Sequence, residues 1–290
     1  MDNYSLGWWD RNEDGSLVYI NGAPNLMIGD IISDQDKEAL DLSFQILNEF
    51  ISFHSYYIYV NRNIEDLLEV LYKVSDKSLR LTNDMKLEYA QEIGRLLNNS
   101  VMQLFVYINY FECTLKDKNL EKFKMLANKY YDEYWEYRFL YQLRNFITHR
   151  TLPSISISSN IINAKRIIKI DAKHLLNNYT KWKQVKNDLE KQIEGVDIID
   201  LFEKTKDMVI KFHKEAILIK QGDLTKGMVF IQRFLKIKNG CLEIPVIIDP
   251  YTEEKLKKGI VSWSTTFRCF ETANKYLIEL NIEEISFGCV

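Results

Sequence analysis

The residues from Arg144 to His149, which read RNFITH, bring a permanent cation, an amide and an imidazole into one short stretch. His149 can take or give a proton near neutral pH, because the unperturbed pKa of histidine is about 6.5. The planar fork of Arg144 matches phosphate oxygens, and Asn145 would orient His149 or hold a phosphate oxygen. Cleavage of RNA without a metal needs a base for the 2′-hydroxyl, an acid for the departing 5′-oxygen and a cation for the phosphate.

A helix is expected to position these groups and to end just after them, at Thr151 and Pro153. A helical wheel places Tyr141 on the same side as the polar residues of the motif. The opposite side is apolar and consists of Phe139, Leu140, Leu143, Phe146 and Ile147. Arg144 and His149 lie about 140° apart on this wheel, so we expect them to flank a groove that a second copy of the chain completes.

Apolar residues at three- and four-residue steps predict helices along most of the chain. Ser33 and Thr82 each precede acidic residues, which is typical of a helix start. A short ribbon is expected within 155–170, and a strand over 242–248. The predicted helices cover 34–59, 64–74, 82–111, 120 to the motif with a break at 130–135, 173–193, 197–219 and 224–237.

The composition supports a mainly α protein. Of the 290 residues, 46% are apolar, which is enough for a substantial core, and only 4 are proline and 11 glycine. We predict a helical bundle over 33–222, preceded by a short β-hairpin segment at 1–32 and followed by a small α+β appendage at 223–290. The net charge of −3 excludes a protein that coats nucleic acid non-specifically, so any RNA contact must be a local basic patch.

The four cysteines, at positions 113, 241, 269 and 289, include no C-x-x-C pair, which disfavours a zinc cage or a dense disulfide framework. The chain has no Walker A loop and no G-x-G-x-x-G, so ATP or dinucleotide chemistry has no support. We expect neither a metal nor a cofactor. The start lacks the regions of a signal peptide, and the apolar runs are too short to cross a bilayer. We therefore expect a cytoplasmic protein without a membrane partner.

The motif resembles the signature of the HEPN superfamily (higher eukaryotes and prokaryotes nucleotide-binding domain): Arg, a polar residue, three further residues and His at the end of a bundle helix. The stretch from Tyr137 to Phe146 also resembles prokaryotic HEPN proteins of abortive-infection and toxin systems. The resemblance is specific over about fifteen residues.

The resemblance implies a metal-independent endoribonuclease that leaves 2′,3′-cyclic phosphate ends, with Arg144, Asn145 and His149 as its catalytic residues. It also implies a homodimer that acts in anti-phage defence or as a toxin, with an antitoxin or another defence protein as a possible partner. The lysine-rich segment 165–186 is the best candidate for an RNA track, with Tyr179 and Trp182 as stacking surfaces. The residues predicted to bind RNA are Tyr141, Thr148, Arg150, Lys165, Arg166, Lys169 and Lys173.

Other interpretations stay open at this point. Arg144 and His149 would also suit a solvated face or pairs with carboxylates that hold the bundle together, and the whole bundle would also suit a non-catalytic module that binds RNA, a nucleotide or a protein. Residues 10–15 match the opening of a calcium loop, but its twelfth position is Asn21 instead of Glu, so we interpret them as a hairpin turn. The isolated histidines at 54, 174 and 213 are interpreted as structural or surface residues.

Overall fold

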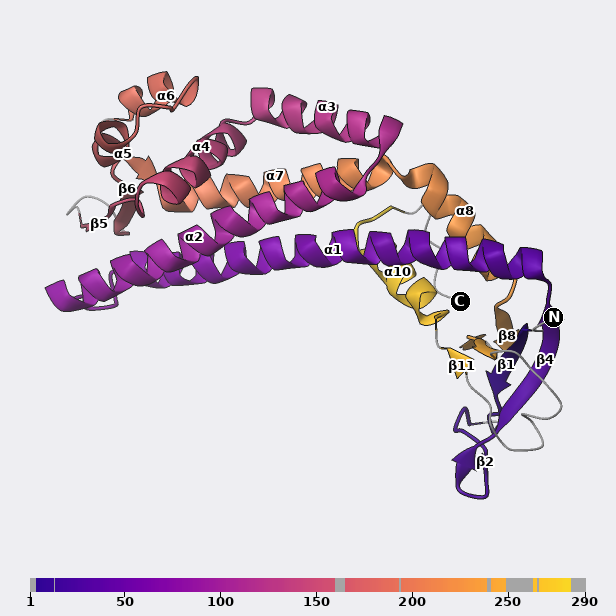
Figure 1. The fold of residues 1–290 in the computed structure, drawn as a ribbon. Helices are drawn as coiled ribbons and strands as arrows, with labels where there is room; N and C mark the ends of the chain where they lie inside the picture. The colour runs from indigo at the N-terminus through magenta and orange to yellow at the C-terminus, as the bar shows by residue number, and fades with distance from the viewer. Residues whose placement is uncertain are drawn as a thin grey trace. The chain divides into compact units, whose positions relative to one another are not determined.

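The structure, a computed structural model, describes residues 4–12, 14–159, 165–192, 194–238, 241–248, 263–264 and 266–282. As the composition predicts, the chain is mainly helical, with small antiparallel sheets (Figure 1). Among the helices in these ranges, none has both the length and the apolar content that crossing a membrane requires.

The chain divides into two compact units. The motif unit is Ser55–Ile219, and the terminal unit joins Met1–His54 to Lys220–Val290. This division differs from the three consecutive ranges expected from sequence. The reason is that strands from the two ends of the chain share one sheet, which the order of segments along the sequence does not reveal.

The first helix, α1 (Asp34–Ser75), is one continuous element of 42 residues. The prediction of two helices separated after Tyr59 is therefore wrong. The intervening residues contain no glycine or proline, and Asn63 Nδ2 donates to the Tyr59 carbonyl at 2.9 Å. Val60 and Ile64 are both buried at helical spacing, so the apolar stripe continues through the expected gap.

Three helices lead to the motif: α2 (Asn83–Thr114), α3 (Asp117–Glu133) and α4 (Trp135–His149). The side chain of Thr82 accepts a hydrogen bond from the backbone N–H of Met85 at 3.2 Å, which confirms the predicted start of α2. The expected break before the motif is also confirmed, and it lies at Tyr134. A hydrogen bond spans this break, in which the guanidinium of Arg138 on α4 donates to the Tyr131 carbonyl on α3 at 2.8 Å.

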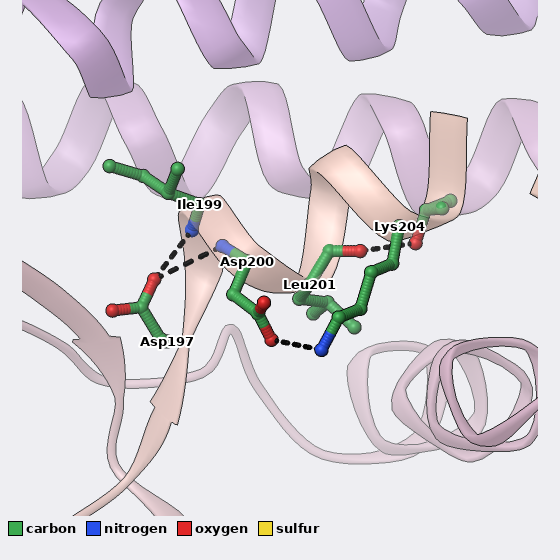
Figure 2. Close-up of polar contacts among 6 residues, drawn as sticks. Asp197, Ile199, Asp200, Leu201 and Lys204 are labelled. Atoms are coloured by element: carbon green, nitrogen blue, oxygen red, sulfur yellow. Dashed lines mark hydrogen bonds and ion pairs between the residues drawn. The ribbon is translucent and has the colours of Figure 1, made fainter. Parts of the chain in front are cut away.

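The helix α7 (Ile198–Leu218) returns along α3 and α4 and closes the bundle of the motif unit. Figure 2 shows its capped start, where one carboxylate oxygen of Asp197 accepts from the backbone N–H groups of Ile199 at 2.9 Å and Asp200 at 3.2 Å. Asp200 in turn pairs with Lys204 at 2.7 Å, four residues along the same face. These contacts fix where α7 leaves the small sheet beside it.

That sheet consists of β5 (Ile155–Ser158), β6 (Ile167–Ile170) and β7 (Val196–Asp197), paired antiparallel in this order. The ribbon predicted within 155–170 is confirmed by the pairing of Ile155 with Ile170. Gly195 has a φ of +97°, and a Cβ there would lie 2.5 Å from the Ile170 carbonyl oxygen. The turn into β7 therefore requires glycine.

Two short helices, α5 (Ala172–Asn178) and α6 (Val185–Lys191), replace the single helix expected over 173–193. Trp182 lies in the loop between them and is fully buried, with its indole N–H donating to the Leu175 carbonyl at 3.2 Å. Figure 1 shows α5, α6, β5 and β6 gathered at one end of the bundle. The loop carrying Trp182 is folded back so that the ring can enter the core, and this bend interrupts the helix.

The terminal unit contains a four-stranded antiparallel sheet of order β11-β10-β1-β4. Its N-terminal strands are β1 (Tyr4–Trp9) and β4 (Leu26–Ile32), which enclose the small hairpin of β2 (Tyr19–Ile20) and β3 (Ala23–Pro24). Its C-terminal strands are β10 (Val246–Ile248) and β11 (Trp263–Ser264).

Three further elements of this unit differ from the predicted boundaries. The helix expected over 224–237 is α8 (Gln221–Gln232), and the chain then forms β8 (Lys236–Lys238), which pairs with β9 (Cys241–Glu243). The strand expected over 242–248 is thus split between β9 and β10, since Pro245 lies between them. The last described helix is α10 (Arg268–Glu279), whose apolar face is buried.

Candidate functional site

The helix α4 carries the motif on the face that it leaves outside the core. Phe139, Leu140, Leu143 and Phe146 are completely buried, as the wheel predicts. His149 is exposed at the last position of the helix, and Arg150 follows as its C-cap, with its N–H donating to the Phe146 carbonyl at 2.8 Å. The buried face therefore fixes the helix, and the motif is available to a ligand or a partner.

Arg144 lies in a hollow of about 610 Å³ between α2, α3 and α4. Its guanidinium carbon is 5.5 Å from the centre of the Phe105 ring, which holds one face of the guanidinium plane. We call this the tyrosine hollow; its lining includes Phe105, Asn109, Glu112, Asn128, Tyr131, Tyr137, Tyr141, Arg144, Lys183 and Gln184.

Burial raises the pKa of the Tyr137 hydroxyl in this hollow, and the nearby Glu112 carboxylate and Tyr141 raise it further. Tyr137 is thus a neutral hydrogen-bonding group at physiological pH. The tyrosine hollow combines aromatic surface, one carboxylate and two cations, which is a suitable environment for a flat polar ligand.

His149 and Asn145 lie in a second hollow, of about 480 Å³, which we call the histidine hollow. Its lining is Gln142, Asn145, His149, Arg150, Tyr179, Thr180, Lys181 and Lys183. No carboxylate is among these residues, whereas Arg150, Lys181 and Lys183 each bring a positive charge. The electrostatics around His149 therefore favour an anion such as a phosphate.

The two hollows are neighbours that share Lys183. This residue has a φ of +50°, in the left-handed region that a lysine adopts only at some energetic cost. Arg144 and His149 line separate hollows, with Lys183 common to both.

The two structural alternatives for the motif are a solvated face and pairs with carboxylates that hold the bundle together; the exposure of His149 is compatible with the first, and the second requires ion pairs. Within the part of the chain that the structure describes, neither Arg144 nor His149 forms an ion pair with a carboxylate, and the amide of Asn145 forms no hydrogen bond. Thr148 is different, because its hydroxyl donates to the Arg144 carbonyl at 2.8 Å. The three residues proposed as catalytic thus have unused hydrogen-bonding capacity.

The residues predicted to bind RNA separate into those that are exposed or line a hollow and those that are held within the fold. Lys165 and Lys173 are exposed, and Arg150 lines the histidine hollow, while Tyr141 lines the tyrosine hollow. Lys169 belongs to the other group, since its side chain is mostly buried and its ammonium pairs with Glu194 at 3.0 Å.

Arg166 has a structural task that the sequence did not suggest. Its side chain is buried, and its guanidinium donates to the carbonyls of Val74 at 3.0 Å, Asp76 at 2.5 Å and Leu79. The carbonyls of Val74 and Asp76 lie at the end of α1, where helix carbonyls lack intrahelical partners, and that of Leu79 lies in the segment that follows. Arg166 thus stabilises the end of α1, and its burial contradicts the prediction that it binds RNA.

The prediction that Tyr179 and Trp182 offer stacking surfaces for RNA bases is wrong. Trp182 has no exposed surface and Tyr179 only 7%. Their rings pack against Phe146, with Trp182 also stacked near Phe139. They support the buried face of α4, and no base can stack on Trp182.

Sequence reasoning missed several residues that line the two hollows, above all Glu112, Asn109 and Asn128. Phe105, Asn109 and Glu112 follow one another at four- and three-residue steps on α2, so a wheel of that helix shows that they share a stripe. No signal in the sequence links this stripe to α4, because the contact between the two helices is tertiary.

The isolated histidines lie in the core or pack on it, as interpreted from sequence. His213 is fully buried, stacked on Tyr57 at 4.1 Å, and its Nδ1 is 2.9 Å from the Tyr107 hydroxyl. His54 is also buried, and desolvation lowers its pKa to about 4. Both are structural residues, and His54 is neutral at pH 7.

The calcium-like segment at 10–15 forms the expected hairpin turn. The backbone N–H of Gly15 donates to the Asn12 carbonyl at 3.0 Å, and Arg11 pairs with Leu17 in an isolated antiparallel β-bridge. The carboxylate of Asp14 accepts from the hydroxyl and the backbone N–H of Ser16 and is used within the turn. Glu13 lies outside the described residues, and among the rest no cluster of three potential metal ligands is found.

Comparisons with protein-family models, with curated proteins and with solved structures find no match for this chain. The resemblance to the HEPN superfamily therefore stays a prediction from the motif.

Proposed function

We propose that this chain is a metal-independent endoribonuclease of HEPN type that cleaves RNA through Arg144, Asn145 and His149. The observation that carries the proposal is the histidine hollow, where an exposed imidazole lies among three cations and no carboxylate. A histidine used only for structure would have a protein partner or a place in the core, as His213 has.

In the proposed reaction the 2′-oxygen of a ribose attacks the adjacent phosphorus, and the bond from phosphorus to the 5′-oxygen breaks. A base takes the 2′-proton and an acid protonates the leaving 5′-oxygen, which leaves a 2′,3′-cyclic phosphate and a free 5′-hydroxyl. His149 performs one of these proton transfers. Arg144 neutralises the charge that gathers on the phosphate, while Asn145 orients a phosphate oxygen or the imidazole.

A concerted reaction needs two titrating groups, and the motif supplies one histidine per chain. We propose that a homodimer brings two motifs together, so that the second proton transfer uses His149 of the other copy. The exposed position of His149 at the end of α4 leaves it accessible for such an arrangement. Lys165, Lys173 and Arg150 extend the positive surface for the RNA backbone.

The experiment is RNA cleavage in the presence of EDTA, comparing the wild-type chain with His149→Ala and Arg144→Ala. Each substitution should lower the rate by about 100-fold or more, the typical contribution of a general acid or base or of a charge-stabilising donor. Arg95→Ala is the matched control, since Arg95 is an exposed arginine of α2 that pairs with Glu92. It should cleave like the wild type.

Circular dichroism should show unchanged helix in all three variants, because none of the substituted side chains is in the core. Full cleavage by both motif variants would overturn the proposal. RNA binding without cyclic-phosphate ends at any protein concentration would instead favour the non-catalytic binding module.

The role in defence or as a toxin, with an antitoxin as partner, follows from the resemblance of the motif. It predicts that expression of the wild-type chain arrests bacterial growth, and that expression of His149→Ala at equal protein level does not. Equal growth with both chains would remove the toxin role and leave the ribonuclease proposal to the cleavage assay.

A further inference from the structure

We propose that the tyrosine hollow binds the base of the nucleotide next to the cleaved phosphate, and that it selects guanine through Glu112. This inference rests on the proposed ribonuclease function, and it adds a specificity-determining residue that the motif does not contain.

The position of the hollow determines which nucleotide it would receive. It shares Lys183 with the histidine hollow, and Arg144 in its wall directly precedes Asn145 in the wall of the other. A phosphate held between Arg144, Lys183 and His149 therefore has the tyrosine hollow on one side. The base attached to a neighbouring ribose is the part of the RNA that can enter it.

The walls of the hollow suit a flat aromatic ring. Tyr141 lies edge-to-face with Phe105 at 5.5 Å and with Tyr131 at 5.8 Å, so the three rings form a corner of fixed geometry. Tyr131 and Tyr141 are only half-buried and keep exposed ring surface. Splayed-out RNA bases typically stack on such surfaces, and a volume of about 610 Å³ is sufficient for a base with part of its sugar.

Glu112 gives the hollow its selectivity. Within the described ranges its exposed carboxylate has neither a hydrogen-bond partner nor an ion pair. Two carboxylate oxygens can accept the N1–H and the N2 amino hydrogens of guanine together. Adenine presents an acceptor at N1, and cytosine and uracil each offer one donor on that edge, so a carboxylate binds each of them less well. The amides of Asn109 and Asn128 can reach further base edges.

The charge arrangement supports this assignment over a pure phosphate site. The Glu112 carboxylate would repel a phosphate bound alone in this hollow. A nucleotide instead places its phosphate on Arg144 and Lys183 and its base donors on the carboxylate. The histidine hollow, which lacks a carboxylate, is the better phosphate site. The two hollows thus divide the nucleotide between them.

The test compares cleavage of matched oligoribonucleotides that differ only in one base, G, A, C or U, flanked by identical residues. The wild-type chain should cleave next to G with a kcat/KM at least about tenfold higher than next to A, the discrimination expected from a paired set of base contacts. Glu112→Gln should lose this preference while it still cleaves. Glu121→Gln, an exposed carboxylate of α3 that lines neither hollow, is the matched control and should keep the preference.

A second measurement separates this inference from the ribonuclease proposal. Binding of GMP and AMP by calorimetry should favour GMP in the wild type and in His149→Ala, and the difference should vanish in Glu112→Gln. Cleavage without a preference for G, or with a preference that Glu112→Gln retains, would overturn the guanine assignment and leave the ribonuclease intact. If no RNA is cleaved, equal binding of GMP and AMP would overturn the guanine assignment as well, whereas a GMP preference lost in Glu112→Gln would support it.

Discussion

Two arginines of this chain, Arg144 and Arg166, differ in their surroundings, and the surroundings decide which hydrogen bonds each can form. Arg144 and Arg166 are both arginines close to the motif in sequence, yet one has its guanidinium edge available in a hollow and the other is buried among carbonyls. The five donors of an arginine must be satisfied once it leaves water. Arg166 meets that need within the fold, whereas the donors of Arg144 stay available for the phosphate that we propose it binds.

The role of Arg166 predicts a loss of stability. Arg166→Ala should lower the free energy of unfolding by about 2–3 kcal/mol, because carbonyls at the end of α1 lose charge-assisted hydrogen bonds in a buried place. Lys165→Ala, the exposed neighbour, should change it by less than about 0.5 kcal/mol. Urea unfolding followed by circular dichroism measures both, and equal stability of the two variants would contradict the assignment.

At the scale of elements, the capped helix starts and the buried stripes were predictable. Thr82 and Ser33 begin helices where the sequence placed them, and the backbone N–H of Asp36 donates to the Ser33 hydroxyl at 3.0 Å. Local chemistry decides such positions. The loop between α5 and α6 was not predictable, since its course is set by the burial of Trp182 among rings from α4.

This loop contains Lys183, whose left-handed backbone predicts an unusual response to glycine. Lys183→Gly should leave the free energy of unfolding unchanged or raise it by up to about 1 kcal/mol, because glycine adopts a φ of this sign without strain. The same substitution removes a cation from both hollows, so RNA cleavage should fall several-fold.

Lys181→Gly is the paired control in the same loop. Lys181 lines the histidine hollow as well, but it is not among the described residues with a positive φ. Its replacement should weaken cleavage and also lower stability, since glycine adds freedom to the unfolded chain. Thermal unfolding distinguishes the two variants; an equal loss of stability in both would remove the argument from backbone strain.

For the molecule as a whole, the sequence locates the motif and its helix, but not the side chains from other helices that line the hollows beside them. The motif and its helix came from spacing alone, whereas Glu112 and Asn128 reach the tyrosine hollow from α2 and α3, far from the motif along the chain. The division into units also escaped prediction, because β1 pairs with β10 across more than two hundred positions of sequence. Contacts between distant segments leave no periodic pattern within either one.

The proposed dimer is tested by measuring RNA cleavage by mixed dimers, in which one subunit is wild type and the other carries His149→Ala. Wild-type and His149→Ala chains with different tags are expressed together, and the mixed dimers are purified through both tags. If cleavage needs the histidines of both copies, the mixed dimer should lose nearly as much activity as the His149→Ala homodimer, because one proton transfer lacks its group. If each copy acts alone, the mixed dimer should keep about half the activity of the wild type. A mixed dimer of wild type and Arg95→Ala controls for the tags, and a chain that stays monomeric while it cleaves at full rate would exclude the shared site.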